Sequence, residues 1–541
     1  MALPHKGMVH RSTVTGTRGM VASAHPLATL AGTRMLLAGG NAFDAAVATA
    51  AALNVVEPFM SGIAGVGFAL IYDAEKKERR LLDYTGRTPM GARPDLFTDP
   101  ASKERGILSC LVPGACAGWL ELLERHGRLT AEAVFAPAIE LAEGGFGLSV
   151  ASDFFFRGAA DRLSERGREI VFGETGPFPG KRLVQPELAE TFRRVVSGGR
   201  ETFYRGSLAQ EMVGFVQDNG GLLTADDMAA YDIEWRDPLS TTYRDYEIFA
   251  PSPPGAGFQI LETLNLIEND NVGEMAFQSP EHLHLLIEAI KLANADRLQY
   301  VAADQPPIEG LLSKGYAAKR RGLIGEKAAE GMGEWYPAQD IDGGVRPGVE
   351  ADWLTECTTH FDAVDGDGNA VAITQSLGSA FGSGLVMGNT GMFLNNFMNW
   401  SELEPRSANL VGPGRKIDMC LSPCQVWKDD KLFSVMGTPG SHGIMQTTVQ
   451  FMSNVLDFGM SMQAAIEAPR LRTEHQGRRV MMEGRFPQQV RAKLEGRGHQ
   501  IDLLPDWSAS VGGAQGILVD SESGVMMGGA DPRRDGYVIG I

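Results

Sequence analysis

The pattern that most restricts the fold runs from Thr358 to Ser376. In this stretch, TTHFDAVDGDGNAVAITQS, apolar and polar residues alternate on both sides of a central DGDGN, residues 365–369. Alternation with a period of two is typical of strands, and an Asp-Gly pair between two such runs is typical of a tight hairpin. The sequence therefore predicts an antiparallel strand pair here. Two more strand pairs are expected, one around residues 421–437 and one from residue 512 onward.

Helices are predicted on the N-terminal side of this hairpin. The Ala-rich segment of residues 38–58 has Asn41 as a capping residue and stops at Pro58, so we expect a helix packed closely against a sheet. Further elements are expected as strands at residues 19–24, 61–73 and 79–83, helices over 185–235, and a clear amphipathic helix over 280–300. Helices packed on strand pairs predict a layered α/β or α+β protein.

Charge and composition exclude several classes of function. The chain has 541 residues, a formal net charge of −18 and a pI near 5.1, so nucleic acid and anionic membranes are not expected partners. It contains no run of 18 apolar residues and no signal-peptide pattern, which favours a cytoplasmic protein. Cys420 and Cys424 lack a second ligand pair nearby, so we expect buried thiols and not a zinc site. No metal or cofactor is expected.

Several common catalytic motifs are missing. No serine has glycine at both −2 and +2, as a nucleophile elbow requires, and Gly180-Lys181 lacks the other residues of a phosphate-binding loop. His284 and Glu288 share one face of a predicted helix, which we interpret as a solvated helix surface. The sequence therefore contains no recognisable Ser-His-Asp or nucleotide-binding site.

Thr358 offers a different chemistry. Residues 303–356 are poor in periodicity and rich in Gly, Pro and acidic residues, which is typical of an exposed connection that can be cut. A cut after Cys357 would give Thr358 a free α-amine beside its hydroxyl group. The unperturbed pKa of such an amine is about 7.7–8.0, so it can accept the hydroxyl proton near neutral pH. No separate histidine or aspartate would then be needed.

Seven blocks of the sequence together resemble the gamma-glutamyltransferase family. They are GGNAFDAAVATAAALNVVEPFMSGIAGVGF, VPGACAGW, TTHFDAVDGDGNAVAITQS, GNTGMFLNN, GTPGS, GGAQGI and ADPRRDGY, in the order typical of the family. The resemblance runs from about Gly19 to the C-terminus. It implies an α+β fold, namely a four-layer αββα sandwich of an N-terminal-nucleophile hydrolase. It also implies a self-cut into residues 1–357 and 358–541, which stay together as a heterodimer, with a dimer of such units as a further alternative.

The resemblance assigns roles to individual residues. Thr358, the first threonine of the TTH motif, is the implied nucleophile, and its amine is the implied base. Ser376 is the hydroxyl residue that supports it. The implied oxyanion donors are two adjacent backbone N–H groups, which fall on Gly440 and Ser441. Because these donors belong to the backbone, the serine side chain does not prevent the role.

The substrate-binding positions depart from the family pattern. The family's arginine that holds a glutamyl α-carboxylate is two positions late here, at Arg87, and a family asparagine is replaced by Gly378. Two polar positions after the Asn-Asn pair are Phe397 and Trp400. The family's paired serines are replaced by Met419 and Cys420. Without these polar partners, burial of the glutamyl ammonium group would cost several kcal/mol.

These departures favour an autoprocessed amidohydrolase acting on a small-molecule amide other than glutathione. An oxamate-type substrate would use Arg87 as an anion site, whereas an acylase-type substrate would use an apolar pocket lined by Phe397 and Trp400. One alternative is a true gamma-glutamyltransferase or glutathione hydrolase. An alternative of another class is a non-catalytic relative that binds a metabolite, which the retained Thr358 and Ser376 disfavour.

Overall fold

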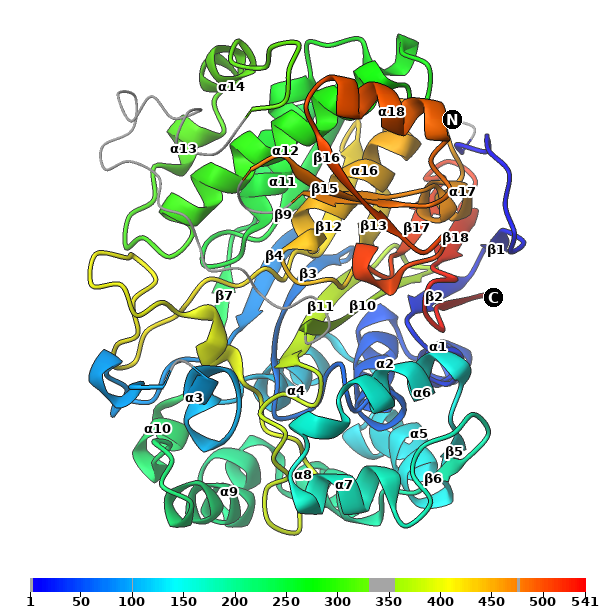
Figure 1. Cartoon of the computed structure of the whole chain (residues 1–541). Helices are drawn as coiled ribbons and strands as arrows, with labels where there is room; N and C mark the ends of the chain where they lie inside the picture. The colour runs from blue at the N-terminus through cyan, green and yellow to red at the C-terminus, as the bar shows by residue number, and fades with distance from the viewer. Residues whose placement is uncertain (1–2, 100, 330–355, 474–476) are drawn as a thin grey trace.

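Two seven-stranded sheets lie face to face at the centre of the protein, and helices cover their outer faces (Figure 1). The computed structural model describes all residues except 1–2, 100, 330–355 and 474–476. The layers follow the order helix, sheet, sheet, helix. This confirms the α+β four-layer sandwich that the resemblance implied.

The first sheet contains the hairpin predicted around residues 365–369. Its neighbouring strands are all antiparallel, and β10 and β11 lie side by side at its centre. Phe68 and Leu70 face the core between the two sheets, whereas Ala69 and Ile71 face the helices, so both faces of this sheet are buried. In spatial order the strands are β19 (Tyr537–Gly540), β2 (Gly19–Ser23), β10 (Glu356–Asp365), β11 (Ala370–Ser379), β3 (Val66–Asp73), β4 (Glu78–Tyr84) and β7 (Glu234–Arg236).

The second sheet contains the two other predicted strand pairs. The pair around residues 421–437 is β12 with β13, and the pair from residue 512 onward is β17 with β18. In spatial order the strands are β1 (Val14–Gly16), β18 (Met526–Ala530), β17 (Gln515–Val519), β13 (Lys431–Gly437), β12 (Cys424–Lys428), β9 (Tyr246–Ala250) and β8 (Leu239–Tyr243).

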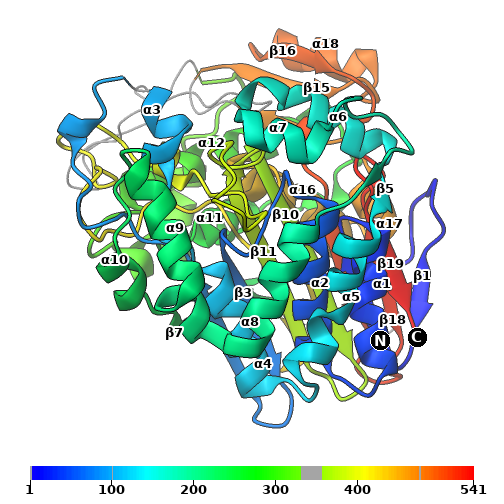
Figure 2. The same cartoon turned by 90° about the horizontal axis from the view of Figure 1, so that it is seen from below.

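The helix predicted after Asn41 is α2, and all of its residues are buried. Asn41 and Asp44 form a reciprocal capping box, and the small alanine side chains allow α2 to pack between the first sheet and α5. Figure 2 shows α2, α5 and α8 together on this side of the molecule. The helices of this half are α1 (Pro26–Leu37), α2 (Ala42–Val56), α3 (Ala101–Glu104), α4 (Ala115–His126), α5 (Ala131–Gly144), α6 (Val150–Gly158), α7 (Glu165–Phe172), α8 (Pro186–Tyr204), α9 (Ser207–Asp218) and α10 (Ala225–Ala230), with a two-stranded sheet of β5 (Phe146–Gly147) and β6 (Arg182–Leu183).

The expectation of an amphipathic helix at residues 280–300 was wrong in one respect. This segment is α12, but nearly all of its residues are buried, because α11 packs on one side and a small third sheet with α18 packs on another. The elements of this half are α11 (Gly257–Ile267), α12 (Pro280–Tyr300), α13 (Ile308–Leu311), α14 (Lys314–Arg321), α16 (Gly443–Leu456), α17 (Met462–Glu467), α18 (Gln488–Gly496), β14 (Leu471–Thr473), β15 (Arg479–Glu483) and β16 (Gln500–Leu504).

The connection expected at residues 303–356 begins with two short helices, α13 and α14, and its part 330–355 lies outside the described residues. Cys420 and Cys424 are buried thiols, as expected. Among the helices that the structure describes, none is both long and apolar enough to cross a membrane.

Candidate active site

Thr358 lies near the start of β10, where the pairing with β11 is irregular. Across the step from Cys357 to Thr359 the register shifts, so that β11 contributes one residue more than β10. A β-bulge of this kind re-aims side chains and is common beside active sites. Thr358 is only 3% exposed, and its Oγ1 donates to Oγ of Ser376 at 3.3 Å. The fold thus brings together the two hydroxyl residues that the sequence singled out.

Ser376 connects the Thr358 hydroxyl to the peptide bond that precedes it. Ser376 Oγ accepts the Thr358 hydroxyl and the Gly378 N–H, the latter at 2.8 Å. Its own proton goes to the carbonyl oxygen of Cys357 at 2.5 Å. All of these residues are buried, so water does not compete for the hydrogen bonds. The Thr358 hydroxyl, the Ser376 hydroxyl and the Cys357 carbonyl oxygen therefore form one hydrogen-bonded chain.

The end of β13, in the second sheet, approaches β10 close to these hydrogen bonds. A Cβ atom added to Gly437, the last residue of β13, would lie 2.4 Å from Cε1 of His360. His360 is two residues beyond Thr358 on β10, so glycine permits the close approach of the two sheets here. The loop that follows leads through Gly440 and Ser441 into α16.

Gly440 and Ser441 have left-handed backbone conformations, with φ of +134° and +54°. Their carbonyl oxygens are occupied, because Gly443 N–H donates to Gly440 O and Ile444 N–H donates to Ser441 O, both at 2.9 Å. The Arg472 guanidinium also donates to Gly440 O at 3.2 Å. Within the described part of the chain, neither the Gly440 nor the Ser441 N–H donates a hydrogen bond. Two adjacent, unused N–H groups have the chemistry of an oxyanion site.

Sequence reasoning missed two charged groups close to Thr358. Arg534 is buried and donates from Nη1 to the Thr358 carbonyl oxygen at 3.2 Å. Glu57 is buried at the end of α2 and accepts the Thr359 hydroxyl at 3.2 Å. Burial raises the pKa of Glu57 to about 7, and the Arg534 charge opposes that rise. The available signal was a charged residue directly after an apolar helical run, but nothing local connects it with residue 358.

Comparison with known proteins identifies the family. The family model described as Gamma-glutamyltranspeptidase matches residues 28–541 of the chain. The chain belongs to the gamma-glutamyltranspeptidase family. Its blocks from residue 39 to the C-terminus, quoted above for their resemblance, lie within this match.

Proteins of known sequence or structure resemble the chain over nearly its whole length. The chain is 37% identical to the glutathione hydrolase-like YwrD proenzyme of Bacillus subtilis (strain 168), covering 98% of this chain and 99% of that protein. It is 35% identical to the acylase ACY 1 proenzyme of Pseudomonas sp. (strain V22), covering 98% and 95%. The crystal structure of cephalosporin acylase from Bacillus halodurans superposes with a TM-score of 0.89 at 33% identity, covering 100% of this chain and 98% of that one. The chain is an amide hydrolase or acyltransferase of this family.

The glycine at position 378 of this family member has a steric cause. Gly378 has a φ of +103°, and an added Cβ would lie 2.2 Å from Oδ1 of Asn396. That oxygen accepts the Ser379 N–H at 2.7 Å, which fixes the amide in place. A side chain at 378 would therefore displace Asn396. The position contributes its backbone N–H to Ser376 and no side chain to a ligand.

Phe397 and Trp400 lie at the two ends of one short 3-10 helix, Phe397–Trp400, but in different surroundings. Phe397 is buried in the core between the sheets, at 1% exposure. Trp400 is half-buried, and its ring lies 4.4 Å from that of His442, centroid to centroid. His442 directly follows Ser441, so Trp400 lies beside the loop of unused N–H groups. Met419 is fully buried and offers no polar atom at a position where the family has a serine.

Arg87 already has protein partners in this structure. Its Nη2 donates to Glu234 at 2.7 Å and its Nη1 donates to the Gly414 carbonyl oxygen at 3.1 Å. Lys416 binds the same carboxylate at 2.8 Å and Asp83 at 2.6 Å. The Arg87 side chain is 40% exposed. The cluster extends from the buried Asp83 to the partly exposed Arg87, where an anion would compete with Glu234 for the guanidinium group.

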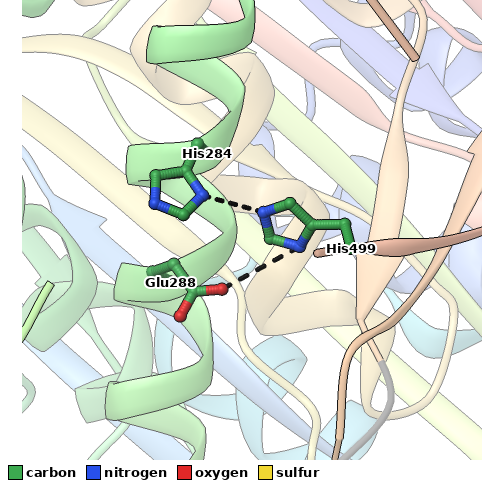
Figure 3. A group of neighbouring side chains, drawn as sticks. All are labelled: His284, Glu288 and His499. Carbon is green, nitrogen blue, oxygen red and sulfur yellow. Dashed lines mark hydrogen bonds and ion pairs between the residues drawn. The ribbon is translucent and has the colours of Figure 1, made fainter. Parts of the chain in front are cut away.

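His284 and Glu288 do not form a solvated surface, contrary to the expectation from sequence. Both are buried on α12. His499, which lies between α18 and β16, packs against them (Figure 3). His284 donates from Nε2 to the Gly325 carbonyl oxygen at 3.0 Å and accepts the His499 Nε2 proton at 2.8 Å. The sequence could not show this, because the covering residue lies 215 positions from His284.

The same three side chains form the one group of His, Cys, Asp or Glu residues, among those that the structure describes, with ligand atoms close enough to hold a metal ion. Lys291 binds Glu288 at 3.0 Å, however, and burial, assisted by the charges of Lys291 and Arg497, lowers the pKa of His499 to about 3. This cationic environment disfavours a metal ion. We assign the group to the packing of α12.

Proposed function

We propose that the chain cuts itself between Cys357 and Thr358 and that Thr358 then attacks small-molecule amides. The observation that carries the proposal is the hydrogen-bonded path from the Thr358 hydroxyl through Ser376 to the Cys357 carbonyl oxygen. The names of similar proteins support it, because the relatives from Bacillus subtilis and Pseudomonas are both described as proenzymes.

In the cutting step, Thr358 Oγ1 attacks the carbonyl carbon of Cys357. The threonine proton passes to Ser376 Oγ, while the Ser376 proton passes to the carbonyl oxygen, so the tetrahedral intermediate forms without a separated charge. Collapse of the intermediate breaks the bond to the Thr358 nitrogen, which keeps its proton and gains another. Water hydrolyses the resulting ester. The products are residues 1–357 and 358–541, which we expect to stay together because their strands share both sheets.

In the cut enzyme, the amine and hydroxyl of Thr358 act together. The neutral amine takes the hydroxyl proton as Oγ1 attacks the substrate carbonyl, and it later returns a proton to the leaving amine. The N–H groups of Gly440 and Ser441 stabilise the oxyanion, because they have no competing partner in the described structure. Water then releases the acyl group from Oγ1.

An apolar acyl group fits this site better than a gamma-glutamyl group. Trp400 lies beside the oxyanion loop, and Met419 and Cys420 are buried in the core. Arg87 is held by Glu234, which weakens the case for an oxamate-type anion. Similarity to proteins described as acylases points the same way. We therefore favour an acylase-type substrate, with gamma-glutamyl compounds as the competing class.

The decisive experiment follows the cut and the activity together. Purified protein is run on a denaturing gel, and the smaller fragment is sequenced from its N-terminus, where Thr358, Thr359 and His360 should come first. The cut protein is then assayed with phenylacetyl, oxamate and gamma-glutamyl amides. An active preparation that consists of the intact 58.2 kDa chain alone would refute the proposal.

A further inference from the structure

Arg534 places a buried positive charge next to the nucleophile. It lies in the loop between β18 and β19, and its guanidinium donates to the Thr358 carbonyl oxygen at 3.2 Å. Gly513 makes room for it, because a Cβ atom there would lie 2.5 Å from Cδ of Arg534. The ring of Phe155 packs beneath the guanidinium at 5.2 Å. The charge is therefore fixed in position and shielded from water.

The distance from this charge to the catalytic amine follows from covalent geometry. Three bonds join the nitrogen and the carbonyl oxygen of one residue, so these atoms are at most about 4 Å apart. The Arg534 charge thus lies within about 7 Å of the nitrogen that the cut would free at Thr358. At an effective dielectric constant of about 20, a unit charge at this distance changes the pKa of an amine by roughly 1 to 2.

Other charges near Thr358 act in both directions. Glu57 accepts the hydroxyl of the neighbouring Thr359 at 3.2 Å, and because burial raises its pKa to about 7 it is only partly ionised at neutral pH. Other charged groups on these elements include His360, Asp362 and Asp365 on β10, Arg472, which donates to Gly440, and Asp531, Arg533 and Asp535 beside Arg534. The cut would also create a carboxylate at Cys357, whose negative charge would act on the amine in the same direction as that of Glu57. β11 contributes the neutral Ser376.

We propose that Arg534 is a positioning residue whose fixed charge keeps the freed α-amine of Thr358 unprotonated at neutral pH, with Glu57 as a weaker counterweight. An unperturbed amine with a pKa of about 7.7–8.0 would be mostly protonated at pH 7, so only a small fraction of the enzyme would carry the neutral amine that accepts the hydroxyl proton. A neighbouring cation disfavours the second positive charge and so increases the fraction of active base. This inference rests on the proposed function, because it requires the cut at residue 358.

The test compares pH profiles of kcat/KM for the cut wild-type enzyme, Arg534→Lys and Arg534→Met. Methionine keeps most of the volume without the charge, so its acid limb should move to higher pH by about 1 to 2 units, with activity recovering at high pH. Lysine keeps the charge, so its limb should stay within about half a pH unit of wild type. A uniform loss of activity in Arg534→Met with an unmoved acid limb would show a purely structural role and overturn the proposal.

A second variant covers the case in which Arg534→Met does not fold or is not cut. Glu57→Gln removes the opposing charge, so its acid limb should move to lower pH; a limb that stays or moves upward overturns the proposal. The proton affinity of the amine is also measured directly, as the pH dependence of Thr358 acetylation followed by mass spectrometry. An active but uncut wild-type chain would instead defeat the proposed function itself, which keeps the two failures apart.

Discussion

Replacement of Ser376 by alanine should slow the self-cut far more than it destabilises the fold. Ser376 Oγ donates to the Cys357 carbonyl oxygen at 2.5 Å, the atom on which negative charge develops and which takes up the Ser376 proton as Thr358 attacks. Loss of one such donor typically slows a reaction by about 10²–10³-fold, or about 2.7–4 kcal/mol in the barrier. The variant also leaves the Gly378 N–H without its partner, which costs about 1–3 kcal/mol of folding free energy.

The matched control is Ser434→Ala. Ser434 is equally buried, on β13, and its hydroxyl donates to the Ile517 carbonyl oxygen at 2.9 Å, so its loss has a similar folding cost. Both precursors are made by cell-free synthesis, and the disappearance of the intact chain is followed on a denaturing gel. Ser434→Ala should be cut within a few-fold of the wild-type rate. If Ser376→Ala is cut as fast as Ser434→Ala, the hydroxyl relay is wrong.

Four further predictions follow from the site and its surroundings. Thr358→Ala should give an uncut, inactive precursor by gel and activity assay; cleavage at the same bond would contradict the nucleophile assignment. Because an unpaired glutamyl ammonium beside Trp400 costs several kcal/mol, gamma-glutamyl anilide should be hydrolysed about 10²-fold more slowly than a phenylacetyl anilide, and comparable rates would refute the pocket. Because Glu234 and Gly414 already hold Arg87, Arg87→Ala should leave KM for anionic amides nearly unchanged, and a KM that rises more than kcat falls would return Arg87 to the substrate site. Burial lowers the pKa of His282 to about 4 and of His499 to about 3, whereas both titrate near 6.5 when unfolded, so stability is complete above pH 6.5 and falls as the pH drops toward 4. At pH 5 the loss is about 2 kcal/mol for each histidine, and a melting temperature equal at pH 7 and pH 5 would contradict it.

Much of the architecture could be predicted from local sequence patterns. The alternation around residues 365–369 predicted the β10–β11 hairpin, and Asn41 predicted the start of α2. Both signals are local, since strand alternation and helix capping depend on residues a few positions apart. Ser376 was named from the resemblance to the family, and the same hairpin brings it to Thr358.

Contacts between distant segments could not be predicted in this way. The segment at residues 280–300 was expected to expose one face, yet α11 covers one side of α12 and the third sheet with α18 covers another. His284 therefore meets His499, which lies 215 residues away. Burial by a segment far away in the sequence cannot be predicted from the periodicity of the segment that it covers.

The sequence by itself determined the strand pairs and the capped alanine-rich helix, because each depends on neighbours in the chain. The resemblance to the family, and not local patterning, singled out the two hydroxyl residues at the hairpin's open end. Only the tertiary structure decided which charges surround Thr358. Glu57 and Arg534 lie 301 and 176 positions from it, and the packing of α2 and of the loop after β18 onto β10 brings them together. Electrostatic effects depend on distance in space and on burial, and neither quantity can be read from the amino-acid sequence.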